Sequence, residues 1–103
     1  MNNTLKNDWL LYQKLLPIWH TNYVAKLLVS YEEILQQDKG ITVKFWELYQ
    51  KINMDKNHPG VNLRLNKSTM LYEIAVLIRE NVITYSDIEG FSDELKMKIR
   101  SNV

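Results

Sequence analysis

Hydrophobic residues recur along most of this chain with the spacing of an α-helix, and the clearest case is residues 18–37. Their apolar side chains lie one, three or four positions apart, the pattern of a helix with one buried stripe about 100° wide. This stripe consists of Val24, Leu27, Leu28, Tyr31, Ile34 and Leu35. A β-strand fits poorly, because adjacent apolar pairs such as Leu27 and Leu28 would each direct one side chain at water. We predict the longest helix of the protein here, with later segments covering its apolar side.

The beginning of this helix has two interpretations, because Pro17 lies just before it. Pro17 can be the first residue of a new helix, where its missing N–H costs nothing, or a bend inside a longer helix. We favour the bent continuation, which would start with the apolar segment 9–16 after an N-cap at Asn7 or Asp8. The end is clearer, since Gly40 can adopt the left-handed turn that stops a helix.

A second helix is expected after an N-cap at Thr42, and the turn-forming residues 56–60 end it. We expect an ion pair between Glu47 and Lys51, which lie four positions apart. The apolar stripe of this helix is Phe45, Trp46, Tyr49 and Ile52.

Three shorter helices complete the prediction. Residues 67–80 have helical spacing, and Asn81 is placed to end that helix in the left-handed conformation. The spacing of residues 86–89 matches the capping box of a short helix, and Ser92 caps a last one. Residues 61–65 alternate apolar and polar side chains but have no second strand to pair with. The chain is thus predicted to be all-α, an irregular bundle of four to five helices with a long central helix and a short extended segment around 61–65.

Length and composition narrow the class further. A chain of 103 residues forms one domain, residues 1–103. The absence of cysteine excludes disulfides and thiolate metal sites, and it suits a reducing cytosol. Thirteen basic and twelve acidic residues do not make the basic surface typical of nucleic-acid binding. No apolar run reaches the ~20 residues of a membrane span, and the first residues do not resemble a secretory signal. We expect a soluble, cytoplasmic protein.

Residues suited to catalysis or metal binding are sparse. His20 lies in line with the core stripe, where a partly buried histidine with one structural hydrogen bond is the simplest interpretation. His58 precedes Pro59 in a turn, and two distant histidines without cysteine do not make a zinc site. The acidic residues of segment 87–94 suit helix starts and lack the spacing of a calcium-binding loop. Phosphate-binding glycine loops and nucleophile elbows are missing from the sequence. We expect no enzymatic activity, no metal and no cofactor.

Aromatic residues are the most unusual feature, with three tryptophans and six tyrosines. Core packing accounts for most of them, but adjacent aromatics such as Phe45 and Trp46 cannot both face inward in a small bundle. Tryptophan and tyrosine left on a surface are typical of interaction sites. The predicted interaction residues are Trp19, Tyr23, Phe45, Trp46 and Tyr49. We therefore predict a small interaction or regulatory module that uses an aromatic-lined helical face to bind a protein partner or to form a homodimer.

Two other functions stay open. A nucleic-acid-binding accessory protein would use a modest basic surface that includes Arg64, Lys67 and Arg79, and its affinity would fall steeply with salt. An enzyme would use His20 with a carboxylate, and it ranks last because no nucleophile or metal set accompanies the histidine.

Four runs of the sequence, taken together, are similar to a family of small bacterial helical proteins without an assigned function. The runs are LLPIWHTNYVAKLL, KFWELYQKI, HPGV and ITYSDIEGFSDELK. The resemblance covers most of the chain but includes no catalytic motif. It implies a bacterial, cytosolic setting and no mechanism.

Overall fold

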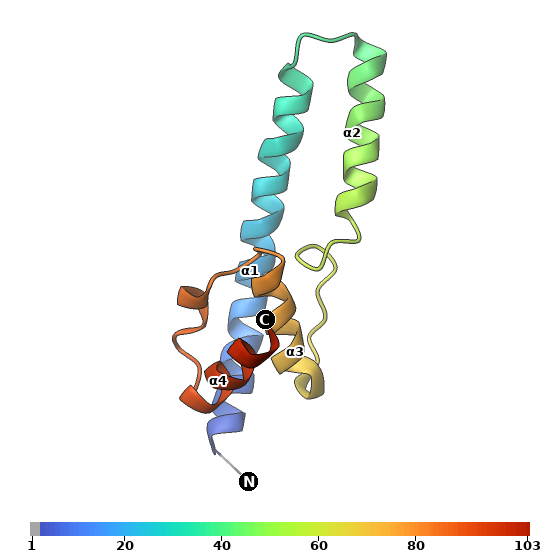
Figure 1. The fold of residues 1–103 in the computed structure, drawn as a ribbon. Coiled ribbons are helices and arrows are strands. Elements are labelled where there is room, and N and C mark those ends of the chain that lie inside the picture. Colours follow the sequence, from blue (N-terminus) through green and yellow to red (C-terminus); the bar gives the residue numbers. More distant parts are fainter. Residues whose placement is uncertain (1–2) are drawn as a thin grey trace.

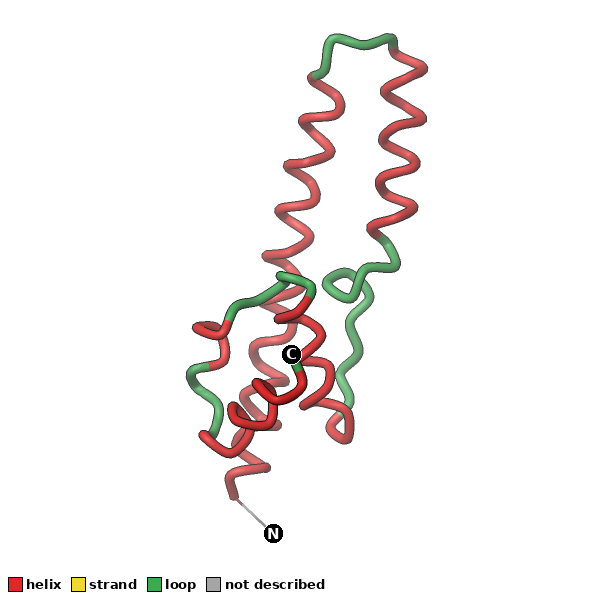
Figure 2. Tube along the Cα trace, viewed as in Figure 1, coloured by secondary structure: helices red, strands yellow, loops and turns green. Residues whose placement is uncertain are grey.

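The computed structural model describes residues 3–103. Met1 and Asn2 lie outside the described residues. They belong to the N-terminal segment for which the sequence predicted no secretory signal. Over residues 3–103 the structure contains four α-helices, two short 3-10 helices and no strand, which confirms the all-α prediction (Figures 1 and 2). The elements are α1 (Asn3–Gln36), α2 (Ile41–Asp55), η1 (Lys67–Thr69), α3 (Met70–Arg79), η2 (Tyr85–Ile88) and α4 (Asp93–Asn102).

Helix α1 is one continuous helix of 34 residues that runs through Pro17. Of the two interpretations left open by the sequence, the continuous helix is therefore the one observed. At 1.5 Å per residue, α1 is about 50 Å long, far longer than the ten-residue helices α3 and α4. The predicted N-cap at Asn7 or Asp8 is wrong, because the helix already includes both residues.

The first half of α1 packs with α3, η2 and α4 into a compact part of the molecule, which we call the head (Figure 1). Tyr12, Leu16 and Trp19 project from α1 into its apolar core. The other core residues come from the C-terminal third of the chain: Met70, Ile74, Ala75, Leu77, Ile78, Ile83, Ile88, Phe91, Leu95 and Ile99. Of residues 18–37, the segment predicted to organise the core, only Trp19 therefore belongs to this core.

The second half of α1 and the antiparallel helix α2 form a hairpin, the arm, that extends away from the head (Figure 1). The molecule is elongated as a result, with extents of 60 × 20 × 19 Å. Of the six stripe residues predicted to be buried on this half of α1, only Ile34 is buried, while Leu28 and Leu35 are half exposed. The expectation that later segments cover the whole stripe is wrong, because the head helices are too short to reach the arm.

Three of the predicted turns and caps are present, but Gly40 has a φ of −59° and does not adopt the left-handed conformation predicted for the end of the long helix. Residues 56–60 form the turn after α2, and residues 63–66 return to the head without regular secondary structure. Asn81 has a φ of 61°, as predicted for a left-handed helix end. The Ser92 hydroxyl accepts from the Leu95 N–H at 3.2 Å and caps α4.

Three local predictions were displaced. The capping box joins Thr84 and Asp87, two residues before the predicted position. Helix α2 begins at Ile41 after Gly40 rather than after Thr42. Glu47 and Lys51 each pair with a different partner: Lys39 binds Glu47 at 2.7 Å, and Lys51 binds Asp55 at 3.0 Å.

Asp8 supplies a tertiary link between the two ends of the chain. Its buried carboxylate accepts from the Ser92 N–H at 2.9 Å and from the Ser92 hydroxyl at 2.6 Å. A buried hydrogen-bonded group of this kind leaves its partners unsatisfied when it is removed. We predict that Asp8→Ala lowers the free energy of unfolding by about 1–3 kcal/mol, measured by urea denaturation. Asp38→Ala, in the exposed tip of the arm, is the control, and equal losses in the two variants would contradict this role.

Candidate functional site

Three aromatic side chains cluster on α2 and are open to solvent. Phe45, Trp46 and Tyr49 are 60%, 54% and 55% exposed. The Phe45 and Trp46 rings meet edge to face with centroids 5.1 Å apart, and Trp46 and Tyr49 do so at 5.8 Å. Edge-to-face pairs of this kind are energetically favourable. The three rings therefore form an ordered surface rather than separate exposed residues.

The structure divides the five predicted interaction residues between three places. Trp19 is only 5% exposed and lies in the core of the head, so it does not belong to an exposed face. It was singled out with Tyr23 because the two are four positions apart, but the head covers this part of α1. Tyr23 is partly buried at the junction of head and arm, where its ring stacks on His58 with centroids 4.9 Å apart. Only the three residues of α2 share one surface.

In the arm, the least exposed residues of α1 mark the side of this helix that packs against α2. Leu27 is partly buried and Ile34 is buried, and each is followed directly by a half-exposed leucine, Leu28 or Leu35. Successive residues turn by about 100° around a helix, so both leucines lie on one flank of the contact with α2. The opposite flank carries the charged residues Lys26 and Glu33.

Helix α2 shows the same relation. Partly buried Lys44, Leu48 and Lys51 lie towards α1, and each is followed directly by an exposed apolar residue. Both helices are right-handed and run in opposite directions, so residues one position after the contact line lie on the same side of the hairpin in both helices. We call this surface the apolar face; it consists of Leu28, Leu35, Phe45, Tyr49 and Ile52. The opposite face, which we call the polar face, carries Lys26, Glu33 and Gln50 together with two exposed apolar residues, Val43 and Met54.

Leu28 and Leu35 were predicted to belong to a buried stripe, but both are half exposed. A signal was present in the sequence. Residues 27–28, 34–35 and 48–49 are adjacent apolar pairs, so the stripes on both helices are wider than one helix–helix contact covers.

Polar contacts join the two helices of the arm. The Tyr31 hydroxyl donates to the Asp55 carboxylate at 2.8 Å, and the Lys51 ammonium donates to the same oxygen at 3.0 Å and lies over the Tyr31 ring. Burial, the hydrogen bond to Asp55 and the Asp55 charge raise the pKa of Tyr31 to about 12. Burial acts to raise the pKa of Asp55, but hydrogen bonds from Lys51 and Tyr31 outweigh it and hold that pKa below its ordinary value.

The arm joins the head at the turn after α2. His58 Nδ1 accepts from the Gly60 N–H at 3.0 Å, and His58 Nε2 lies 3.7 Å from a Glu80 carboxylate oxygen. Gly60 is buried against Tyr23, and a Cβ atom added there would lie 2.5 Å from the tyrosine ring. Glycine is therefore required at this position for the close approach of the turn to α1.

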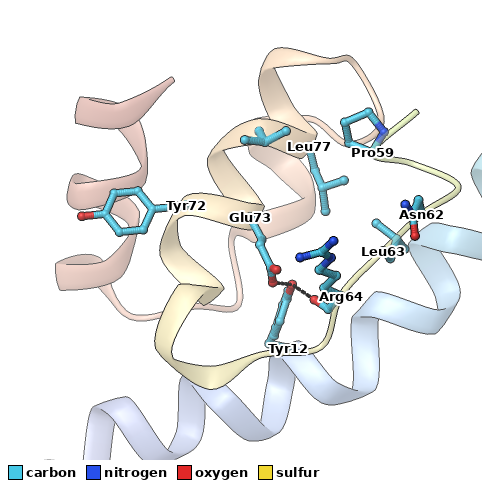
Figure 3. A pocket seen from close by; sticks show the side chains of 9 residues that line it. Tyr12, Pro59, Asn62, Leu63, Arg64, Tyr72, Glu73 and Leu77 are labelled. Atoms are coloured by element: carbon cyan, nitrogen blue, oxygen red, sulfur yellow. Dashed lines mark hydrogen bonds between the residues drawn. The ribbon is translucent and has the colours of Figure 1, made fainter. Parts of the chain in front are cut away.

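The head contains a pocket of about 190 Å³ between α1, α3 and residues 59–64 (Figure 3). There the Tyr12 hydroxyl donates to the Glu73 carboxylate at 2.9 Å and lies 3.3 Å from the Arg64 carbonyl oxygen. Burial and the bond to Glu73 raise the pKa of Tyr12 far above its ordinary value. The pocket is smaller than the roughly 300 Å³ at the lower end of small-molecule sites. It is a weaker candidate than the arm.

The residues of the other sequence-based hypotheses lie apart. Lys67 begins η1 before α3 and Arg79 ends α3, twelve residues later, while Arg64 lies in the segment before η1. These three residues therefore do not form one compact basic patch. His20 is partly buried, as expected, and lines a pocket with Leu16 and Pro17. Within residues 3–103 no group of three or more histidines and carboxylates is placed to hold a metal ion.

Comparisons with known proteins found no matching family model, no similar curated protein and no similar solved structure. The resemblance to small bacterial helical proteins therefore stays a prediction. Across the described part of the chain, no helix combines the length and the apolar character needed to cross a membrane.

Tyr31 makes the stability of the arm depend on pH. A tyrosine whose pKa rises on folding contributes stability below the unfolded pKa of about 10, and loses it as the pH rises through the folded value of about 12. We predict that Tyr31→Phe lowers the free energy of unfolding by about 1 kcal/mol near pH 9, and that this difference disappears near pH 12. Urea denaturation of both proteins across this range measures it. A difference that does not change with pH would contradict the role of the Tyr31–Asp55 bond.

Proposed function

We propose that this protein is a protein-interaction module and that the apolar face of the arm is its binding surface. The observation that carries the proposal concerns α2: none of its fifteen residues, all of them described, is buried. Helices of this length are marginal in water and depend on packing of an apolar face. Helix α2 packs on α1 through residues that are only partly buried, such as Leu48 and Lys51, while Phe45 and Tyr49 face solvent.

The size and composition of the apolar face support this function. Each of its five side chains exposes a surface on the order of 100 Å². This is about half of the area that an aromatic side chain removes from water when it is fully buried. Together with Trp46 they reach the upper end of the ~300–600 Å² that the largest apolar patch of a monomer covers. Aromatic side chains at the centre of such a patch contribute most to the affinity of protein interfaces.

A binding role also agrees with the sequence, which offers no nucleophile, phosphate loop or metal-ligand set to accompany His20. We place the module in the bacterial cytoplasm. This setting is supported by the absence of cysteine and by the resemblance to small bacterial proteins.

Site-specific photo-crosslinking in the organism of origin tests this function. Benzoylphenylalanine is incorporated at position 45 on the apolar face or, as the matched control, at position 43 on the polar face of the same helix. Phe45 and Val43 are both about half exposed, so the two probes are equally accessible to solvent. We expect a covalent protein adduct from position 45 and not from position 43. Equal labelling at both positions, or no adduct at position 45, would exclude the apolar face as a binding surface.

A further inference from the structure

We propose that the partner of the apolar face is a second copy of this chain, and that two arms pack face to face into a four-helix bundle. This inference rests on the proposed function, because it identifies what covers the same surface. Three features of the arm carry it: the spacing of its apolar residues, the chemistry of the face and the position of the head.

Both helices of the arm carry apolar residues with the 4-3-4 spacing of coiled-coil core positions. The row on α1 is Val24, Leu28, Tyr31 and Leu35, and the row on α2 is Ile41, Phe45, Leu48 and Ile52. Core rows of this kind are covered on both flanks in a helix bundle. In the single arm they are covered on one flank only, since Val24, Tyr31 and Leu48 are partly buried and the other five are exposed. The pattern therefore specifies two more helices than one chain supplies.

The arm of a second chain has the length that the two missing helices of the bundle require. Each row spans twelve residues, or about 17 Å of helix, so one arm covers another along its whole apolar length. Side chains from α1 and α2 meet at a groove of about 120 Å³, which is mostly apolar and includes Val24, Tyr31 and Ile52, with Asp55 and Lys56 also in its lining. A row of apolar side chains from a second arm can fill such a groove, as in other four-helix bundles.

The chemistry of the face is compatible with its own copy. An interface with two-fold symmetry brings identical patches together, so a charged patch would repel itself. None of the eight row positions, all described, carries a charged side chain. Residues 18–55 contain four lysines and five acidic residues, so the arm has a net charge of only −1 and attracts neither a strongly basic nor a strongly acidic partner.

The head does not obstruct this approach. Trp19, which packs into the head core, is seven residues before Lys26 of the polar face, so it lies on nearly the same side of α1. The head thus extends from the polar side of α1 and leaves the apolar face open.

Sedimentation velocity on the full chain, from about 1 to about 200 μM, tests the proposal. We expect a species of twice 12.3 kDa whose population grows with concentration. Phe45→Glu places a charge in the interface and should raise the dimer dissociation constant at least about 100-fold. Val43→Glu, the same change two residues away on the polar face, should leave it within about threefold. A wild-type protein that stays monomeric, or a dimer that survives Phe45→Glu, would overturn the proposal.

A second pair of variants covers the case in which Phe45→Glu unfolds α2, which circular dichroism would show as lost helix. Leu28→Glu on the apolar face of α1 and Lys26→Glu on its polar face repeat the comparison on the other helix. The dimer must then be lost with Leu28→Glu and kept with Lys26→Glu. If the wild-type protein is monomeric but position 45 crosslinks a different protein in cells, only the second copy is excluded and the interaction module stands. If neither association is found, both proposals fail.

Discussion

The structure depends on the unequal lengths of its helices. Helix α1 is about 50 Å long, whereas the helices that pack on it in the head have ten residues each. The head therefore covers only the first half of α1, and Pro17 does not divide the helix into two. The segment after α2 packs against the first of residues 20–36, including Tyr23, and beyond it only α2 lies alongside α1. One helix covers one side of another. An apolar surface on the arm is the direct consequence of this geometry.

The sequence was sufficient to predict the helices but not the location of the core. Residue spacing identifies helices, caps and turns because these are local, and Asn81 and Ser92 were assigned correctly. Burial depends on what reaches a residue in three dimensions. Leu16 and Leu28 look alike in the sequence, yet one is buried by the head and the other is half exposed on the arm. Asp8 was misassigned for the same reason, since its partner Ser92 is 84 residues away.

The candidate site was predictable in part. Phe45 and Trp46 were selected because adjacent aromatics cannot both face a core, and both are exposed. That argument uses only the angular spacing of a helix, so it does not depend on tertiary structure. Trp19 was selected with Tyr23, four positions away, but this spacing does not show which part of α1 other helices cover. Trp19 meets Tyr12 and Phe91 inside the head. The exposure of adjacent aromatics follows from helix geometry, whereas the burial of Trp19 depends on helices that are distant in the sequence.

The arm also shows why its apolar face is not simply an incomplete core. The Tyr31 hydroxyl of α1 donates to Asp55 at the C-terminal end of α2, and Lys51 pairs with the same carboxylate within α2. If hairpin formation were the only requirement on α2, its phenylalanine and tyrosine would lie on the contact line, where burial stabilises most. They are instead one position away, on the open flank. Leu27, Ile34 and Leu48 and one tyrosine–carboxylate hydrogen bond join the two helices, and the aromatic side chains of α2 stay exposed beside this contact.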